Sequence, residues 1–186
     1  MHKKQGVISC AILLMFGIVL LSFEVNFVCA SDSNEEQVHK MPAINPPASF
    51  DPLKKLVGSW KGTQDSPEGK KEVAVEYYLT SAGTALVEKT GPGSEYEMLS
   101  VYHGQGDNVV MTHYCAFGNQ PKMAMVKSDD SNTIRFSYID SGTANDAHMH
   151  QLTLKWVSAD HLTQEWVFHQ NGKPAHTAKF DLHRKM

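Results

Sequence analysis

The sequence predicts an all-β protein: an antiparallel up-and-down β-barrel of about ten strands, preceded by one short N-terminal helix. Apolar and polar residues alternate with a period of two from Gly58 almost to the C-terminus, which is typical of half-buried strands. Turn-forming segments such as SPEGK, GQGD and QNGKP separate these stretches. Apart from 141–147, no link is long enough for a crossover, so neighbouring strands should pair antiparallel.

The short helix is expected directly before the first strand. Asp51 can cap it, Pro52 suits its first turn, Leu53 and Leu56 share one side, and Gly58 ends it. The ten strands should then form a meander that closes into a barrel, because closure removes unpaired edges. A barrel wider than eight strands has room for a small ligand. The expected strands are 58–64, 72–80, 84–90, 95–103, 108–116, 122–128, 133–140, 150–157, 161–170 and 175–183.

Side-chain parity assigns an inward face to several of these strands, because alternate residues point to opposite sides. The faces of 108–116 and 122–128 stay ambiguous. In the last three strands the residues expected to point inward are Leu152, Leu154, Trp156, Leu162, Gln164, Trp166, Phe168, His176, Ala178, Phe180 and Leu182.

The first thirty residues resemble a secretory signal peptide. Lys3 and Lys4 precede an almost wholly apolar run over 7–23, and small residues at Val28 and Ala30 favour cleavage after Ala30. An uncleaved anchor helix is the alternative, and a lipid anchor is less favoured. We therefore expect a periplasmic or secreted protein of the bacterial envelope, with no stable membrane insertion after cleavage.

The rest of the chain should comprise a disordered leader or linker over 31–49 and one barrel domain over 50–186. Three prolines and no periodicity mark the leader. A formal charge of −3 and a pI near 6.3 offer no basic field for a phosphate backbone, so nucleic-acid binding is not expected. Cys115 is the one cysteine after residue 30, so the core must be stable without an internal disulfide.

Histidines supply the main candidate site. His148 and His150 stand two apart, and if their strand begins early enough both point into the barrel or its mouth while Met149 points away. His113 and Cys115 form a second such pair, and imidazole with thiolate suits Zn²⁺ or copper. These four residues are the candidate metal ligands, although a His-lined pocket without metal and a purely structural role both stay open.

Polar residues elsewhere complete the candidate ligand-binding set, which we take as His113, His148, His150, His176, Tyr102, Gln164, Asn119 and Gln120. Asn119 and Gln120 lie in a link where their amides could hydrogen-bond a ligand or simply form the turn. No catalytic residue is assigned: His113 and Cys115, at i and i+2, lie about 7 Å apart along a strand, too far for a direct hydrogen bond. Catalysis is left open, and a binding role is favoured.

The segment Leu56-Val57-Gly58-Ser59-Trp60-Lys61-Gly62 and the ending Phe180-x-Leu182-x-Arg184-Lys185 resemble the calycin superfamily, and within it lipocalin-like and nitrobindin-like exported bacterial domains of unknown function. Met111–Cys115, Gly118–Pro121 and His148–His150 are similar to an exported subgroup. Lipocalins imply a small apolar ligand in the cup. Nitrobindins imply haem on a histidine near the C-terminus, where His176 has inward parity and His183 outward parity.

The leading hypothesis is therefore an exported, non-enzymatic barrel that binds a small apolar or haem-like molecule in its cup. The alternative is a periplasmic Zn- or Cu-binding protein or metalloenzyme that uses the His/Cys set. A third hypothesis is that the barrel only presents a surface to a partner, in which case its interior should be packed solid. Haem or a Zn or Cu ion is a possible cofactor, and ligand identity and oligomeric state stay open.

Overall fold

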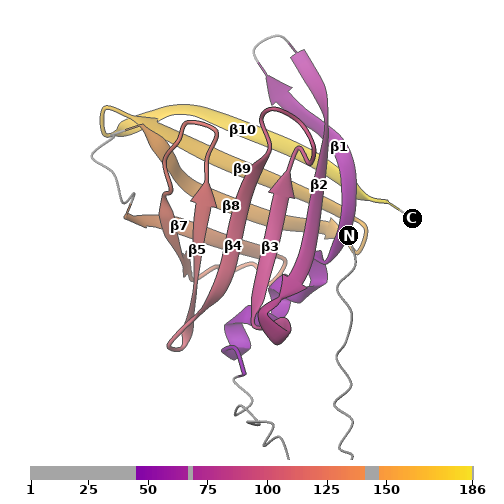
Figure 1. Ribbon diagram of the computed structural model, residues 1–186, viewed down its shortest axis with the longest axis vertical. Helices are drawn as coiled ribbons and strands as arrows, with labels where there is room; N and C mark the ends of the chain where they lie inside the picture. The colour runs from indigo at the N-terminus through magenta and orange to yellow at the C-terminus, as the bar shows by residue number, and fades with distance from the viewer. Residues whose placement is uncertain (1–44, 67–68, 141–146, 186) are drawn as a thin grey trace, which may run out of the picture. The chain divides into compact units, whose positions relative to one another are not determined.

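A computed structural model describes residues 45–66, 69–140 and 147–185. Ten antiparallel strands close into one barrel in which sequence neighbours pair and β10 returns to pair with β1 (Figure 1). The predicted fold class is confirmed. The elements are η1 (Ala48–Leu56), β1 (Gly58–Ser66), β2 (Gly69–Thr80), η2 (Ser81–Gly83), β3 (Ala85–Thr90), β4 (Met98–Gln105), β5 (Asn108–Tyr114), β6 (Lys122–Val126), β7 (Thr133–Asp140), β8 (His148–Ser158), β9 (His161–Gln170) and β10 (Lys173–Arg184).

Helix η1 is a 3₁₀ helix that begins at Ala48, earlier than the cap expected at Asp51. Its apolar residues explain the difference. Phe50, Leu53 and Leu56 recur every three residues and are all fully buried, and a helix with three residues per turn places such a series on one side. These three side chains join the barrel core and close one end of it.

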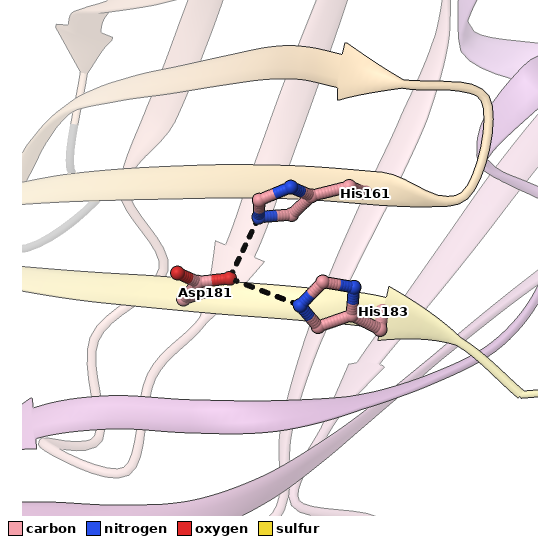
Figure 2. Close-up of side chains that lie close together, drawn as sticks. All are labelled: His161, Asp181 and His183. Atoms are coloured by element: carbon pink, nitrogen blue, oxygen red, sulfur yellow. Dashed lines mark hydrogen bonds and ion pairs between the residues drawn. The ribbon is translucent and has the colours of Figure 1, made fainter.

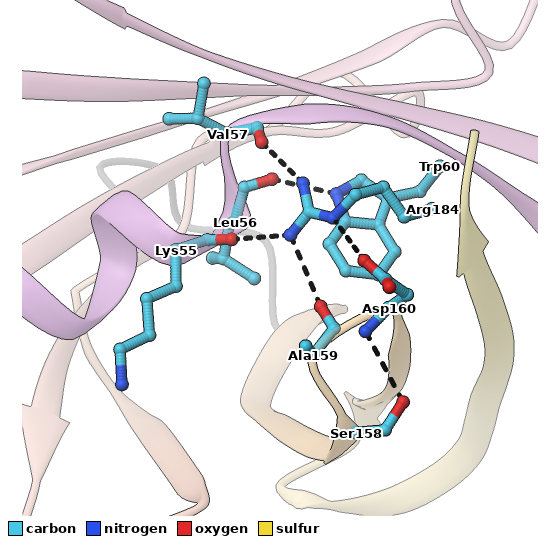
Figure 3. Close-up of polar contacts among 8 residues, drawn as sticks. All are labelled: Lys55, Leu56, Val57, Trp60, Ser158, Ala159, Asp160 and Arg184. Carbon is cyan, nitrogen blue, oxygen red and sulfur yellow. Dashed lines mark hydrogen bonds and ion pairs between the residues drawn. The ribbon is translucent and has the colours of Figure 1, made fainter. Parts of the chain in front are cut away.

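The Arg184 side chain links several elements at the same end of the barrel (Figure 3). Its guanidinium lies 4.2 Å from the Trp60 ring and donates to the carbonyl oxygens of Val57 at 2.7 Å and Lys55 at 2.9 Å. Its Nε donates to Asp160 Oδ1 at 3.1 Å, in the turn between β8 and β9. One side chain thus joins the helix, the first strand and the β8–β9 turn.

The barrel interior is filled by side chains along most of its length. The strands contribute large fully buried residues, among them Tyr102, Met111 and Phe136. Strand β1 also approaches its neighbour closely, because a Cβ on Gly62 would lie 1.8 Å from the carbonyl oxygen of Asp181.

The predicted signal peptide at 1–30 and most of the leader at 31–49 lie outside the described residues. Within the described ranges, no helix has both the length and the apolar character to cross a membrane.

Candidate functional site

A carboxyl group lies inside the barrel. Glu88 is fully buried on β3, and neighbouring side chains donate hydrogen bonds to it. The hydroxyl of Tyr102 donates to Oε2, while Gln164 Nε2 at 3.2 Å and Thr90 Oγ1 at 3.4 Å donate to Oε1. Gln164 also donates to the hydroxyl oxygen of Tyr77. Most buried polar groups in folded proteins are paired in this way, because an unpaired one is costly.

Burial raises the pKa of Glu88, and the hydrogen bonds from Tyr102 and Gln164 partly oppose that rise. Burial, followed by the nearby charge of Glu88, raises the pKa of both Tyr77 and Tyr102 well above the usual value. The two phenols therefore stay protonated and can donate. The sequence predicted an inward position for Gln164 and indicated Tyr102 and Glu88 as possible pocket residues, although a strand glutamate usually lies on the solvated outer face.

A second buried polar group, His113, lies on β5. Its Nδ1 is 3.0 Å from Ser100 Oγ on the neighbouring β4, and its ring lies 4.7 Å from the Trp166 ring. The side chain is 2% exposed, and Nε2 has no hydrogen-bond partner among the described residues. Burial lowers the pKa of His113 to about 4, so its imidazole is neutral at physiological pH and its Nε2 is available to a ligand.

His113 lines a small cavity of about 30 Å³. This volume is about the share of one water molecule in the liquid. Five of the lining side chains are apolar or aromatic, and three of the residues, Gln64, Met98 and Met149, are half-buried. The lining residues are Gln64, Thr90, Met98, His113, Met149, Trp166, Ala178 and Phe180.

Hydrogen bonds connect the side chains around Glu88 to residues that line this cavity. Trp166 Nε1 donates to Gln164 Oε1 at 3.3 Å, and Thr90 donates to Glu88. Both Trp166 and Thr90 line the cavity. Two cavity walls are therefore held in place by hydrogen bonds that end on one buried carboxyl group.

His148 and His150 do not line this cavity, and the expectation that Met149 points away from the interior is wrong. The pairing of β8 with β9 shifts between Met149 and Gln151, so His150 is an extra residue and the alternation reverses there. Met149 packs against the core and lines the cavity instead.

The two histidines belong to a separate aromatic cluster with Tyr138 and His169. His148 Nε2 is 3.1 Å from His150 Nδ1, and the rings of His150 and His169 stack at 3.7 Å. Tyr138 stacks on His148 at 4.1 Å. Burial, then the neighbouring His169 and His148, lowers the pKa of His150.

The remaining predicted ligand-binding residues lie apart from His113. Asn119 is buried and its amide donates to the carbonyl oxygen of Ala147 at 2.5 Å, whereas Gln120 is exposed and donates to Gly118. His176 is exposed on β10. The structure thus brings neither amide of the 117–121 link to the cavity wall.

The predicted metal set of His113, Cys115, His148 and His150 is not assembled. In the described part of the chain, the one group of three ligand atoms within 4.8 Å of one another is His161, Asp181 and His183. Cys115 is buried, and burial raises the pKa of its thiol. The thiol therefore stays protonated near neutral pH, which suits neither metal binding nor nucleophilic attack.

A haem does not fit this interior. Pockets for ligands of drug size occupy about 300 Å³ or more, roughly ten times the cavity beside His113. On the last strand His176 is exposed, and His183 contacts Asp181 away from the buried face that carries Leu182.

Sequence reasoning missed several cavity residues, namely Met98, Thr90 and Gln64. Thr90 follows Leu86 and Glu88 at alternate positions on β3, and this parity could have indicated one inward face. Val87 and Ala85 on the other face are also apolar, so the six-residue strand shows no clear alternation.

Comparisons with known proteins give the fold alone. No family model matches the chain, and no curated protein matches it. Among solved structures, the chain is similar to the crystal structure of Rv2717c from M. tuberculosis, with a TM-score of 0.52 and 16% sequence identity. The match covers 76% of this chain and 100% of that chain. The chain therefore shares its ten-stranded antiparallel barrel with a known structure.

Proposed function

We propose that this chain is an exported, calycin-like β-barrel that binds a small, largely apolar molecule beside His113. One observation carries the proposal. His113 Nε2 is buried, neutral and without a partner among the described residues, and it belongs to a residue that lines a cavity. An unpaired buried polar atom is costly to a fold, so a role in binding explains its presence.

The cavity lining indicates the chemistry of the ligand. Trp166, Phe180 and Met149 offer apolar contact, whereas His113 offers one hydrogen-bonding nitrogen. If Ser100 donates to Nδ1, then Nε2 carries the ring proton and donates to a ligand; if Nδ1 carries the proton and donates to Ser100, then Nε2 accepts. The ligand should therefore have a small apolar body with a single polar group.

Ligands larger than a few atoms require the half-buried side chains to move. Met98 and Met149 are unbranched and flexible, so they can change rotamer at modest cost. We place the entrance of the site at these two methionines. Export is supported by the signal-like segment at 1–30, and its direct test is whether the mass of the envelope-located protein corresponds to cleavage after Ala30.

Native mass spectrometry of protein purified from its own compartment tests ligand binding. We expect a retained organic mass, and a raised melting temperature with short-chain fatty acids or alcohols. His113→Phe should abolish both effects, because the phenyl ring keeps the packing and removes Nε2. His176→Ala, at an exposed histidine, is the matched control and should leave both unchanged.

The filled interior also favours a second candidate function, that of a barrel that presents its surface to a protein partner. Protein that is always empty and is stabilised by no small molecule would support this second function and contradict the first. Burial of the large core residues is compatible with both.

A further inference from the structure

A group of metal-ligating side chains lies on the outer face of β9 and β10, away from the cavity. His161 of β9 pairs directly with His183 of β10, and Asp181 stands two residues before His183. Residues two apart on a strand point to the same side, and directly paired residues are neighbours across it. Leu162 and Leu182, which alternate with these three, are fully buried.

The three side chains converge on a common point (Figure 2). Asp181 Oδ1 lies 2.8 Å from His161 Nε2 and 3.6 Å from His183 Nε2. The imidazole rings stack at 4.3 Å, and the three ligand atoms all lie within 4.8 Å of one another. Ligand atoms around a tetrahedral Zn²⁺, with bonds of about 2.0–2.2 Å, lie roughly 3.3–3.6 Å apart. The observed separations bracket that range.

The backbone that carries these ligands is held firmly. Asp160, next to His161, accepts from Arg184 Nε (Figure 3). The backbone N–H of Arg184, next to His183, also donates to the Asp160 carbonyl at 3.0 Å. His161 and His183 are therefore each adjacent in sequence to a residue of the Asp160–Arg184 pair, which two hydrogen bonds join. Rigid support lowers the entropy that a metal site must lose when the ion binds.

Several lysines near this face oppose cation binding. Lys179, two residues before Asp181, forms an ion pair with Glu165 at 3.4 Å. Lys61 of β1 pairs with His183, while the residue paired with Asp181 on that strand is the uncharged Thr63. On the other side Thr163 pairs with both Asp181 and Lys155, and Lys155 forms an ion pair with Asp130 at 3.9 Å. The lysine side chains are long and can extend into solvent, so they need not pair with Asp181, and its carboxylate can bind a metal ion.

We propose that His161, Asp181 and His183 form a binding site for a divalent transition-metal ion of the Zn²⁺ class. Two imidazole nitrogens and one carboxylate oxygen match the donors that such ions prefer. Three protein ligands leave the fourth position of a tetrahedral ion to water or an added ligand. The site lies on the solvent side of the barrel wall, so it needs no opening of the core.

Calorimetric titration of the purified chain with Zn²⁺ alone tests the proposal. We expect a saturable event that His161→Ala, Asp181→Asn and His183→Ala each weaken by at least about tenfold, since each removes one of three ligands. Cu²⁺ should bind more tightly than Zn²⁺, as the Irving–Williams order requires.

Two variants serve as controls. His176→Ala, on the same strand, and His150→Ala, in the separate histidine cluster, should keep the event unchanged. Far-ultraviolet circular dichroism in EDTA should show that all five variants are folded, because the three ligand side chains are exposed or half-buried. Loss of the event in His150→Ala with retention in His161→Ala would overturn the proposal, as would absence of any saturable Zn²⁺ binding.

Discussion

The hydroxyl of Tyr102 donates a hydrogen bond to Oε2 of Glu88 at a depth where neither side chain reaches solvent. We expect Tyr102→Phe to lower the free energy of unfolding by about 2 kcal/mol, because the carboxyl oxygen loses a donor and water cannot replace it. Urea denaturation measures this. Tyr96→Phe, at a tyrosine that is 66% exposed, is the control and should change little. Equal effects of the two variants would contradict the prediction.

Glu88 should make stability depend on pH. Its pKa is raised in the folded barrel, so its contribution is fully present below its unfolded value of 4.5 and is lost as pH rises through the folded pKa. Glu88→Gln cannot titrate. The free energy of unfolding of the wild type relative to this variant should fall as pH rises above 4.5, by up to about 1.4 kcal/mol per pH unit. A difference that stays constant with pH would exclude this titration.

His113 should make the free energy of unfolding depend on pH with the opposite sign. Its pKa is lowered from 6.5 to about 4 on folding, so its contribution is present above pH 6.5 and is lost as pH falls toward 4. The loss corresponds to about 3 kcal/mol. His113→Asn keeps a polar atom near Ser100 and does not titrate, so the wild type should lose this amount relative to the variant across that interval. Parallel pH curves for the two proteins would count against it.

Arg184 should contribute to stability through geometry rather than charge. Arg184→Lys keeps the charge but cannot donate to Val57, Lys55 and Asp160 together, so we expect a loss of about 2 kcal/mol. Thermal and urea unfolding measure it. Lys185→Ala, at the exposed neighbouring side chain, is the control and should be nearly neutral. A lysine variant as stable as the wild type would show that the charge alone suffices.

Alternation in the sequence predicted the barrel and the inward positions of Gln164, Trp166 and Leu162, because buried faces impose a period of two. It could not predict Met149 as a cavity residue, because a one-residue bulge reverses the parity. Alternation also could not establish that Glu88 is buried, because a strand glutamate is usually exposed. Only barrel closure brings Tyr102 and Gln164 to it.

The His161 site shows a similar limit. At the β9–β10 turn Lys173 pairs with Gln170, and regular pairing from there would place Leu182 opposite His161. An irregularity between Pro174 and His176 shifts the register by one, so His183 becomes the partner. Turn length alone therefore gives the wrong pair, and the proline near the turn is where the register changes.

The pairing of Trp60 with Arg184 has a consequence for how the chain folds. Strands β1 to β9 can form as successive hairpins during synthesis, but β1 has no second partner until the final strand has been made. Joining residues this far apart in sequence is slow, because the chain loses loop entropy before the contact forms. Until then β1 and β9 present open edges, so truncation within β10 should cause aggregation rather than a smaller barrel.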